Sequence, residues 1–428
     1  MNETFMSYLW KYRYLSPEIT TESGDLLTVF HPGDQNTESG PDFFNARIRI
    51  GETTWAGNVE IHVKASDWYR HGHHSDPSYD HVILHVVYEA DRQVFHQNGV
   101  PVQTLVIRDR FPGWIFDRYR QMMQNQQWIP CMNQLLLSGE KGFDFWAPAL
   151  AVERLEFRTN SIRQVFHDCG SNWEEALYRH MAGSFGFSIN AQPFGMLAKA
   201  LPYKIARQHL HSRFQLEALL FGQAGMLERV FTDEYPVSLQ SEYCFLRDKY
   251  NLEPVEGSLW KFLRLRPSNF PTIRISQFAG FLQRSQSGLF DLARSGSLPD
   301  IMEMLAVEAS DYWHDHYVFD KTAITRPKEM GPASIRLLII NGIVPFFFFY
   351  GVEKDQPDVC EHFLGFLEQL EGENNALIGQ WKKAGLPTQN ALQTQALIQL
   401  KKCYCDRKRC LECRVGEGLM GGRVTGDG

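Results

Sequence analysis

Four residues of types that support hydrolytic chemistry, Asp42, Glu60, His62 and Lys64, lie within one short stretch of the chain. Carboxylate oxygens are the ligands that Mg²⁺ and Mn²⁺ prefer. Such cations stabilise the charge that develops on a phosphodiester, and they lower the pKa of bound water. A histidine or lysine beside them could orient that water or the phosphate. We therefore expect Asp42 and Glu60 to bind a divalent cation, and His62 or Lys64 to act as the positioning group.

A β-hairpin is expected to carry these residues. Two alternating runs, residues 43–50 and 53–64, flank Gly51-Glu52, which is a two-residue turn signal. Because side chains alternate along a strand, the polar residues of GNVEIHVK share one face. This face is either solvated or the floor of an active site, and the pattern leaves both interpretations open.

The expected hairpin register separates the two carboxylates. Counting back from a tight turn pairs Phe43 with Glu60, which turns Asp42 toward the opposite face. A shared cation needs both carboxylates on one side. We therefore predict a bulge near Gly57, or a divergence of the strands after Pro41, that brings the carboxylates within about 6 Å of each other.

The run VILHVVY, residues 82–88, predicts a central strand, because it is apolar on both faces. His85 lies inside this run. A buried imidazole needs a hydrogen-bonding partner or a metal ion, so His85 is either a structural histidine or a further metal ligand.

A histidine-rich link joins the two predicted strand regions. It could form a transition-metal site together with His62 or His85, or its side chains could simply lie in water. The residues concerned are His71, His73, His74, Asp76 and His81.

The order of these elements resembles the PD-(D/E)xK nuclease superfamily over roughly residues 1–110. A helix is followed by strands that carry Pro41-Asp42 and Glu60-x-His62, then by a short link and a buried strand. The resemblance implies an α/β nuclease fold in which Asp42 and Glu60 bind Mg²⁺ or Mn²⁺. His62 stands where that superfamily usually has lysine, unless Lys64 takes the role.

Longer phrases resemble an uncharacterised bacterial family of unknown function over nearly the full chain. This second resemblance implies no activity. The phrases are GPDF, GNVEIHVKASDW, DHVILHVVYE, NGIVPFFFFYG and the terminal cysteines.

Four of the eight cysteines crowd into a C-x-C-x4-C-x2-C pattern near the C-terminus. Paired thiols on two short turns can place four sulfurs around Zn²⁺. We expect a zinc knuckle, with an iron–sulfur cluster or free thiols as the alternatives. Several basic side chains surround it and could contact nucleic-acid phosphates. The proposed metal ligands are Cys403, Cys405, Cys410 and Cys413.

Composition and patterning place these motifs in a chain of the α+β class. The chain has 428 residues, 43% hydrophobic content and a net charge of −7, which are typical of a globular protein and unlike a generally basic nucleic-acid coat. We expect a nuclease-like α/β domain with a mixed sheet over 1–112, an irregular helical domain over 113–400, and the zinc knuckle with a mobile tail over 401–428.

The cellular setting is expected to be the cytoplasm. The N-terminus lacks the pattern of a signal peptide, and unpaired cysteines suit a reducing compartment. The most apolar run, LLIINGIVPFFFFY over residues 337–350, is short for a membrane span and contains a proline, so we predict a kinked core helix and no membrane partner.

Three functions are compatible with these features. The first is a metal-dependent nuclease that hydrolyses phosphodiester bonds in DNA or RNA. The second is a non-catalytic nucleic-acid-binding or scaffold protein with a degenerate nuclease fold. The third is a metallohydrolase based on His62, His71, His73 and His85.

Overall fold

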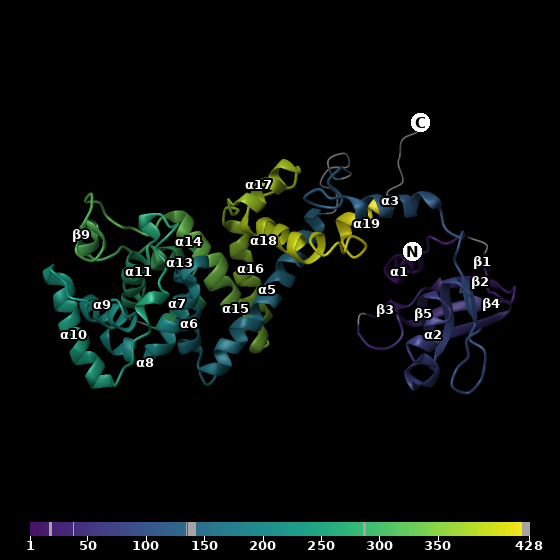
Figure 1. The fold of residues 1–428 in the computed structure, drawn as a ribbon, viewed down its shortest axis with the longest axis horizontal. Helices are drawn as coiled ribbons and strands as arrows, with labels where there is room; N and C mark the ends of the chain where they lie inside the picture. Colours follow the sequence, from purple (N-terminus) through teal and green to yellow (C-terminus); the bar gives the residue numbers. More distant parts are fainter. Residues whose placement is uncertain (17–18, 37, 134, 136–142, 286–287, 422–428) are drawn as a thin grey trace. The chain divides into compact units, whose positions relative to one another are not determined.

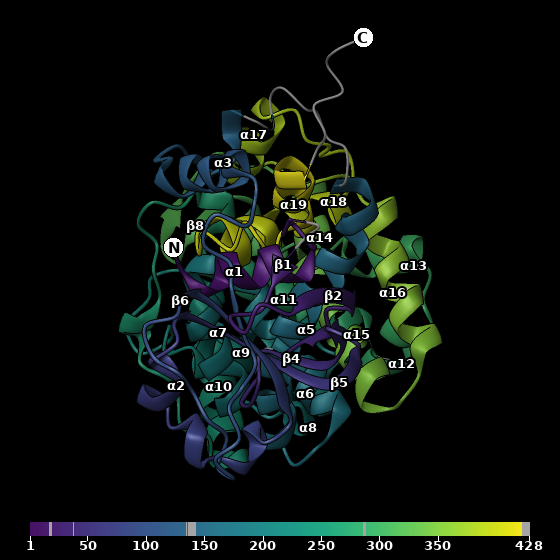
Figure 2. The same cartoon turned by 90° about the vertical axis from the view of Figure 1, so that its right-hand side faces the viewer.

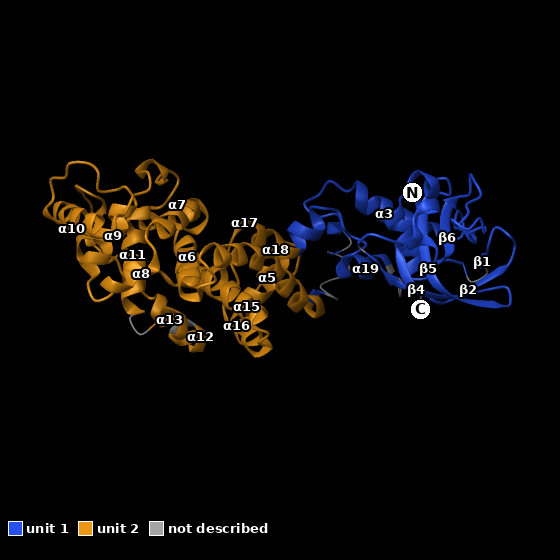
Figure 3. Cartoon of the chain, turned by 90° about the horizontal axis from the view of Figure 1, so that it is seen from below, with its two compact units in different colours: residues 1–143, 400–428 blue, residues 144–399 orange. Residues whose placement is uncertain are grey.

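The computed structural model of the chain describes residues 1–16, 19–36, 38–133, 135, 143–285 and 288–421. It divides into two compact units (Figure 3). Unit 1 comprises residues 1–143 together with 400–428, and unit 2 comprises residues 144–399. The sequence predicted boundaries at 112 and 400. In this division residues 113–143 and the cysteine-rich tail belong with the N-terminal sheet.

Unit 1 is built on one mixed sheet (Figure 1) with strand order β1-β2-β4-β5-β6-β7 and β3 paired to β4. The pairs from β1 to β5 are antiparallel, whereas β5–β6 and β6–β7 are parallel. The predicted mixed sheet is therefore confirmed. The strands are β1 (Ile19–Thr20), β2 (Leu26–His31), β3 (Asp34–Gln35), β4 (Phe43–Ile50), β5 (Thr53–Lys64), β6 (Val82–Glu89) and β7 (Thr104–Val106).

The β4–β5 hairpin has the predicted limits, and Ile50 pairs with Thr53 across the turn. The register shifts further along, so that Phe43 pairs with Val59 and not with Glu60. The shift lies next to Asn45, whose φ of 59° is left-handed. Such a bulge places two residues opposite one and reverses the parity of the preceding residues.

The bulge therefore lies in β4, on the strand that faces Gly57. The sequence predicted a bulge near Gly57 or a divergence of the strands after Pro41. Gly57 has a separate role, because a Cβ atom there would lie 2.4 Å from Ile83 Cγ2 and 2.7 Å from the carbonyl oxygen of His81. Glycine lets the start of β6 approach β5 closely.

Helices cover the sheet of unit 1. Helix α1 (Glu3–Lys11) begins at Asn2, whose side chain accepts a hydrogen bond from the amide of Phe5. It packs against β5 (Figures 1 and 2). The link between β5 and β6 contains α2 (Asp67–Arg70) and the 3₁₀ turns η1 (His73–Ser75) and η2 (Pro77–Tyr79).

The segment around Asn98-Gly99 forms a tight turn with an antiparallel bridge between Phe95 and Pro101. Hydrogen bonds from the amide of His96 to the carbonyl oxygen of Val100, and from the amide of Val102 to the carbonyl oxygen of Val94, lie on either side of this bridge. Residues 104–106 form β7, which pairs in parallel with β6.

Unit 2 is helical, as predicted, apart from the short pair β8 (His316–Val318) and β9 (Lys321–Thr322). Its helices are α5 (Phe143–Asp168), α6 (Trp173–Phe185), α7 (Phe187–Ala200), α8 (Tyr203–Ala206), α9 (Arg213–Gln223), α10 (Glu234–Tyr250), α11 (Pro271–Arg284), α12 (Leu289–Ser295), α13 (Leu298–Leu305), α14 (Pro332–Leu338), α15 (Val344–Glu353), α16 (Pro357–Gln369), α17 (Ala376–Lys383) and α18 (Ala391–Gln399).

The apolar run of unit 2 forms a longer helical segment than the sequence predicted. It spans Pro332–Glu353, and its length and composition would suffice to cross a membrane. However, 78% of its most apolar window is buried inside the structure, as in a core helix. Pro345 lies in the first turn of α15, and the irregularity is the π-helical turn Ile339–Ile343 that precedes it.

The tail has a helical start and a helical end. The π-helical turn η8 (Leu400–Cys405) follows α18, and α19 (Arg414–Gly421) packs beside α3 (Gly113–Gln124) within unit 1 (Figure 3). The sequence predicted a mobile tail to residue 428. Its last residues, 422–428, lie outside the described residues.

Candidate metal centre

The two predicted carboxylates are neighbours in the structure. The amide of Asp42 donates to Glu60 Oε2 at 3.1 Å, and the amide of Ile61 donates to Asp42 Oδ2 at 2.9 Å. The bulge at Asn45 makes this possible, since Asp42 then stands opposite Glu60. Glu60 is only 5% exposed, so this part of the polar strand face is not solvated.

Burial and the charge of Glu60 raise the pKa of Asp42 to about 7. Two close carboxylates in a poorly hydrated site disfavour each other's ionisation. A divalent cation would relieve this repulsion and would favour the charged form of both groups.

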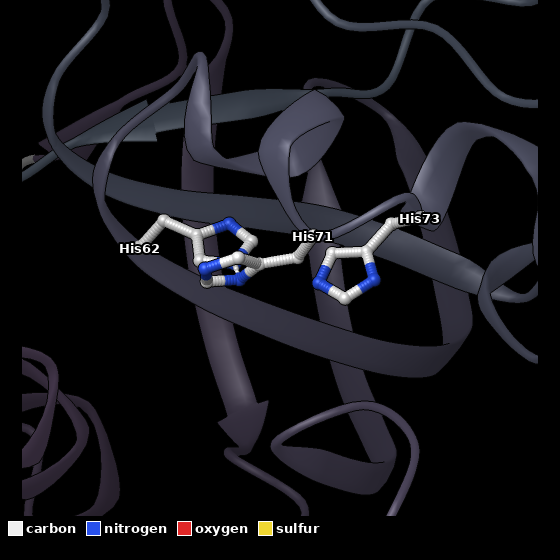
Figure 4. A group of neighbouring side chains, drawn as sticks. All are labelled: His62, His71 and His73. Atoms are coloured by element: carbon white, nitrogen blue, oxygen red, sulfur yellow. Dashed lines mark hydrogen bonds between the residues drawn. The ribbon is translucent and has the colours of Figure 1, made fainter.

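Glu60 also faces two histidines, and a third histidine contacts one of them. Its Oε1 lies 3.4 Å from His62 Nε2 and 3.2 Å from His73 Nε2, and His62 Nε2 lies 3.1 Å from His71 Nδ1. The three imidazoles offer nitrogen atoms that all lie within 4.8 Å of one another (Figure 4). His62 comes from β5, whereas His71 follows α2 and His73 begins η1.

These spacings match those of ligand atoms around a metal ion, and they are also distances of hydrogen bonds and ion pairs. With metal–nitrogen distances of about 2.0–2.1 Å, two ligand atoms of a tetrahedral ion lie about 3.3–3.4 Å apart. The three contacts around Glu60 Oε1 and His62 Nε2 fall between 3.1 and 3.4 Å. The donors therefore fit a transition metal ion, and Glu60 joins this histidine cluster to Asp42.

The turn after α2 directs the loop histidines back to the sheet. Gly72 ends the helix with a left-handed φ of 81°, a position that favours glycine. The ring of His73 stacks on Tyr79 at 3.7 Å between centroids, and Trp68 meets its edge. Of the loop histidines, only His71 and His73 belong to the group whose nitrogens lie within 4.8 Å of one another, and His74 and His81 lie outside it.

His85 lies behind the cluster, fully buried on β6 as the sequence predicts. Its Nε2 is 2.8 Å from His62 Nδ1, while its own Nδ1 has no hydrogen-bond partner. A hydrogen bond between two neutral imidazoles needs one donor and one acceptor nitrogen, so His85 has a hydrogen-bonding partner, which the sequence offered as the alternative to a metal ion. His85 lies outside the group of histidines whose nitrogens lie within 4.8 Å of one another.

The two buried histidines are neutral at physiological pH. Burial lowers the pKa of His62 to about 2, with smaller contributions from His85 and His73. Burial likewise lowers the pKa of His85 to about 3. Neutral imidazole is the form that binds metal ions, so His62 would not need to lose a proton to bind a cation.

Lys64 stands apart from this group. Its side chain is exposed at the end of β5, where its positive charge contributes to a lowered pKa of the exposed Asp91. Among the described residues, no hydrogen bond or ion pair joins the Lys64 ammonium to Asp42 or Glu60. The structure thus brings together Asp42, Glu60, His62 and His85, and adds His71 and His73.

We expect the metal-free protein to lose stability as the pH falls below about 6.5. His62 and His85 have folded pKa values below that of an exposed histidine, so unfolding takes up protons there. Asp42 opposes this trend between about pH 4 and 7, because its folded pKa is raised and unfolding releases its proton. Asp42→Asn should therefore steepen the acid destabilisation by about one proton.

Urea denaturation in EDTA at several pH values measures this slope for both proteins. Because the other titrating groups are common to the two chains, the difference between them isolates Asp42. Equal slopes would show that the Asp42 carboxyl titrates normally in the folded protein.

Comparison with known proteins gives a family but no activity. No curated protein and no solved structure matches the chain. A family model described as protein of unknown function (DUF2851) matches residues 3–376, which include Asp42, Glu60 and the whole histidine cluster but not the terminal cysteines. The chain therefore belongs to this family of proteins of unknown function.

Proposed function

We propose that the chain is a metal-dependent hydrolase of phosphodiester bonds in DNA or RNA. The observation that carries the proposal is the position of Glu60. One of its oxygens accepts the amide hydrogen of Asp42, and the other faces the nitrogens of His62 and His73. Glu60 is buried, and among the described residues it forms no salt bridge to a lysine or an arginine. This carboxylate is therefore suited to hold a cation.

The topology of unit 1 supports the proposed nuclease function. Helix α1 precedes an antiparallel set of strands, the short helix α2 follows β5, and β6 then pairs in parallel. This is the element order on which the resemblance to PD-(D/E)xK nucleases rests, with Asp42 before β4 and Glu60 within β5.

Each residue has a distinct part in this proposal. Asp42 and Glu60 hold the cation, which would neutralise charge on the phosphodiester and activate a bound water. The Nδ1 of His62 contacts His85 and its Nε2 contacts His71. Because both nitrogens already have partners, His62 would position Glu60 and would not bind the attacking water. His71 is the exposed member of the cluster and can exchange protons with solvent.

A cavity in unit 1 offers a surface for a ligand. Its volume is about 990 Å³, and its lining includes Tyr12, Tyr14, Lys11 and Arg414 but also Glu412 and Glu417. Aromatic rings beside basic groups are suited to stack on bases and to contact phosphates, whereas the two glutamates would oppose a phosphate there. The contribution of the tail is limited, because several of its basic groups already have partners within the protein.

A second candidate function follows from the histidine cluster itself. His62, His71 and His73 with Glu60 form a nitrogen-rich donor set, which suits Mn²⁺, Zn²⁺ or another transition metal better than Mg²⁺. In this case the chain is a histidine-based metallohydrolase, and its substrate need not be a nucleic acid.

Cleavage assays with the purified full-length chain test the proposal. Single-stranded and double-stranded DNA and RNA are incubated with EDTA, Mg²⁺, Mn²⁺ or Zn²⁺. We expect cleavage with Mg²⁺ or Mn²⁺ and none with EDTA. Activity with Zn²⁺ and none with Mg²⁺ would favour the second candidate. Binding of nucleic acid without cleavage under any condition would instead identify a non-catalytic protein.

A further inference from the structure

A cavity of about 850 Å³ lies within unit 2, among α5, α6, α7 and the π-helical turn Ile339–Ile343. Its lining combines apolar side chains, such as Val165, Phe187 and Leu337, with a few polar groups. Cavities of this size and composition are typical of sites for small organic molecules. The polar groups therefore indicate which kind of molecule the cavity fits.

The guanidinium of Arg158, on α5, is held at the cavity wall by Asn341. Its Nη1 donates to Asn341 Oδ1 at 2.9 Å, and its Nη2 donates to the carbonyl oxygen of Asn341 at 3.0 Å. A longer contact of 3.5 Å joins Nη1 to the carbonyl oxygen of Ile340. These contacts use at most three of the five N–H donors of an arginine, so at least two remain for a ligand.

The positive charge of Arg158 has no carboxylate in direct contact, since it forms no ion pair with any of the described residues. Burial, followed by the charge of Arg154, lowers the pKa of Arg158 to about 10. Glu373 also lines the cavity and acts on Arg158 from a longer distance, in the opposite direction. Two guanidiniums and one carboxylate leave a single positive charge, which suits a ligand with one negative charge.

The other two basic residues of the lining add little charge. Arg179 is paired with Glu175 at 2.7 Å. The Nε2 of His180 donates to the carbonyl oxygen of Gly342 at 3.1 Å, and burial, followed by the charge of Arg158, lowers the pKa of His180 to about 4. His180 is therefore neutral near pH 7, and Arg158 is the lining group that can receive an anion.

The π-helical turn fixes these side chains at the cavity. Three successive carbonyl oxygens, those of Ile340, Asn341 and Gly342, accept hydrogen bonds from Arg158 or His180. Turns of this kind are frequent at functional sites. The donors of Arg158 are thus oriented before any ligand arrives, which lowers the entropic cost of binding.

We propose that this cavity binds a small organic carboxylate, with Arg158 receiving the carboxylate and the apolar lining contacting its carbon part. A guanidinium matches the two oxygens of a carboxylate with paired N–H donors. Glu373 disfavours a phosphate dianion in the same place, because like charges repel. The proposal concerns unit 2 alone and does not depend on the hydrolytic function.

Calorimetric titration of the full-length chain with four probes that share a phenyl ring tests the proposal. We expect saturable binding of phenylacetate, and at least about tenfold weaker binding of phenylacetamide and phenyl phosphate. The fourth probe, L-phenylalanine, adds an ammonium group that Glu373 can accept. Tighter binding of L-phenylalanine than of phenylacetate would identify the ligand as an amino acid, and the reverse order as a simple acid.

Variants of Arg158 test its part in binding. Arg158→Gln should weaken phenylacetate binding at least about tenfold, because charge-assisted hydrogen bonds are lost. Arg158→Lys keeps the charge without the paired donors and should give an intermediate affinity. Arg163→Gln is the matched control, since it makes the same change on the same helix at a residue outside the lining.

A second position keeps the test decisive if Arg158→Gln fails to fold. Gly183 lines the cavity on α6, and a Cβ atom there would lie 3.8 Å from the carbonyl oxygen of Ala191, which is an ordinary contact. Gly183 shares its helix face with Arg179 and His180. Gly183→Leu should therefore fill the cavity and abolish phenylacetate binding, whereas Gly183→Ala should retain it.

Several results would overturn the proposal. Equal affinities for phenylacetate and phenylacetamide would show that no charge is recognised, and tighter binding of phenyl phosphate would assign the site to phosphate. Unchanged phenylacetate affinity in Arg158→Gln or in Gly183→Leu would place binding elsewhere. If neither acid binds saturably, Arg158 serves only to hold the π-helical turn.

Discussion

Glu60→Gln is expected to reduce nucleic-acid cleavage to less than about a hundredth of the wild-type rate, because the cation contributes several kcal/mol to transition-state stabilisation. The same variant should lose stabilisation by the cation. A ligand at 100 times its dissociation constant stabilises the folded state by about 2.7 kcal/mol, and this increment requires an intact site. Cleavage assays and thermal unfolding with and without Mg²⁺ or Mn²⁺ measure the two effects.

The fold should survive this substitution. A glutamine oxygen can still accept the amide hydrogen of Asp42, as Glu60 Oε2 does at 3.1 Å. In EDTA the variant should be at least as stable as the wild type, since the repulsion that raises the pKa of Asp42 is removed. A merely structural Glu60 would give the opposite result, with lower stability in EDTA and no change in the response to metal.

Glu52→Gln provides a matched control. Glu52 lies in the turn of the same hairpin and is exposed, so the substitution makes the same change of charge away from the site. It should leave both cleavage and metal-dependent stabilisation unchanged. Equal losses in the two variants would point to a general effect of charge and would remove the support for a cation at Glu60.

The strands that carry the site could be predicted from sequence because their patterns are local. Alternation and the Gly51-Glu52 turn determine the limits of β4 and β5, and two apolar faces identify β6 as a central strand. The register between Asp42 and Glu60 could not be predicted in the same way. It depends on the left-handed residue Asn45, and asparagine tolerates that conformation without requiring it.

Local sequence patterns also could not predict which histidines belong to the cluster. His73 and His74 are adjacent in sequence, yet His73 is buried against Tyr79 and Trp68 while His74 is exposed beside Tyr69. Which of them faces Glu60 depends on the turn at Gly72 and on packing across the sheet. The sequence could therefore indicate a possible metal loop but could not select its ligands.

The cysteines show the same limit. The C-x-C-x4-C-x2-C pattern suggests a complete site within eleven residues. The helical backbone at residues 400–405 puts Cys403 and Cys405 two positions apart on a helix, where side chains do not face each other, and the spacing alone does not contain this feature. Patterns in the sequence identify the type of ligand more reliably than the set of ligands.

His73→Phe is expected to distinguish the two cation sites proposed at Glu60, one with Asp42 and one with the histidine cluster. Phenylalanine keeps an aromatic ring against Tyr79 and Trp68 but removes both ring nitrogens. The dissociation constant for Mn²⁺ or Zn²⁺ at the cluster should rise at least about tenfold, because a ligand 3.2 Å from Glu60 Oε1 is lost. Mg²⁺-dependent cleavage should persist, since Mg²⁺ is held by oxygen ligands such as Asp42 and Glu60.

His74→Phe is the control for this prediction, because it makes the same change at the neighbouring exposed position. Calorimetric titration of Mn²⁺ and Zn²⁺ into both variants, with cleavage assays in Mg²⁺, gives the comparison. If His73→Phe abolishes both metal binding and every cleavage activity while His74→Phe does not, the histidine cluster is the catalytic metal site. The metallohydrolase function would then replace the Mg²⁺-dependent nuclease. If neither variant changes transition-metal affinity, the nitrogens gathered around Glu60 are a buried hydrogen-bonding network and not a metal centre.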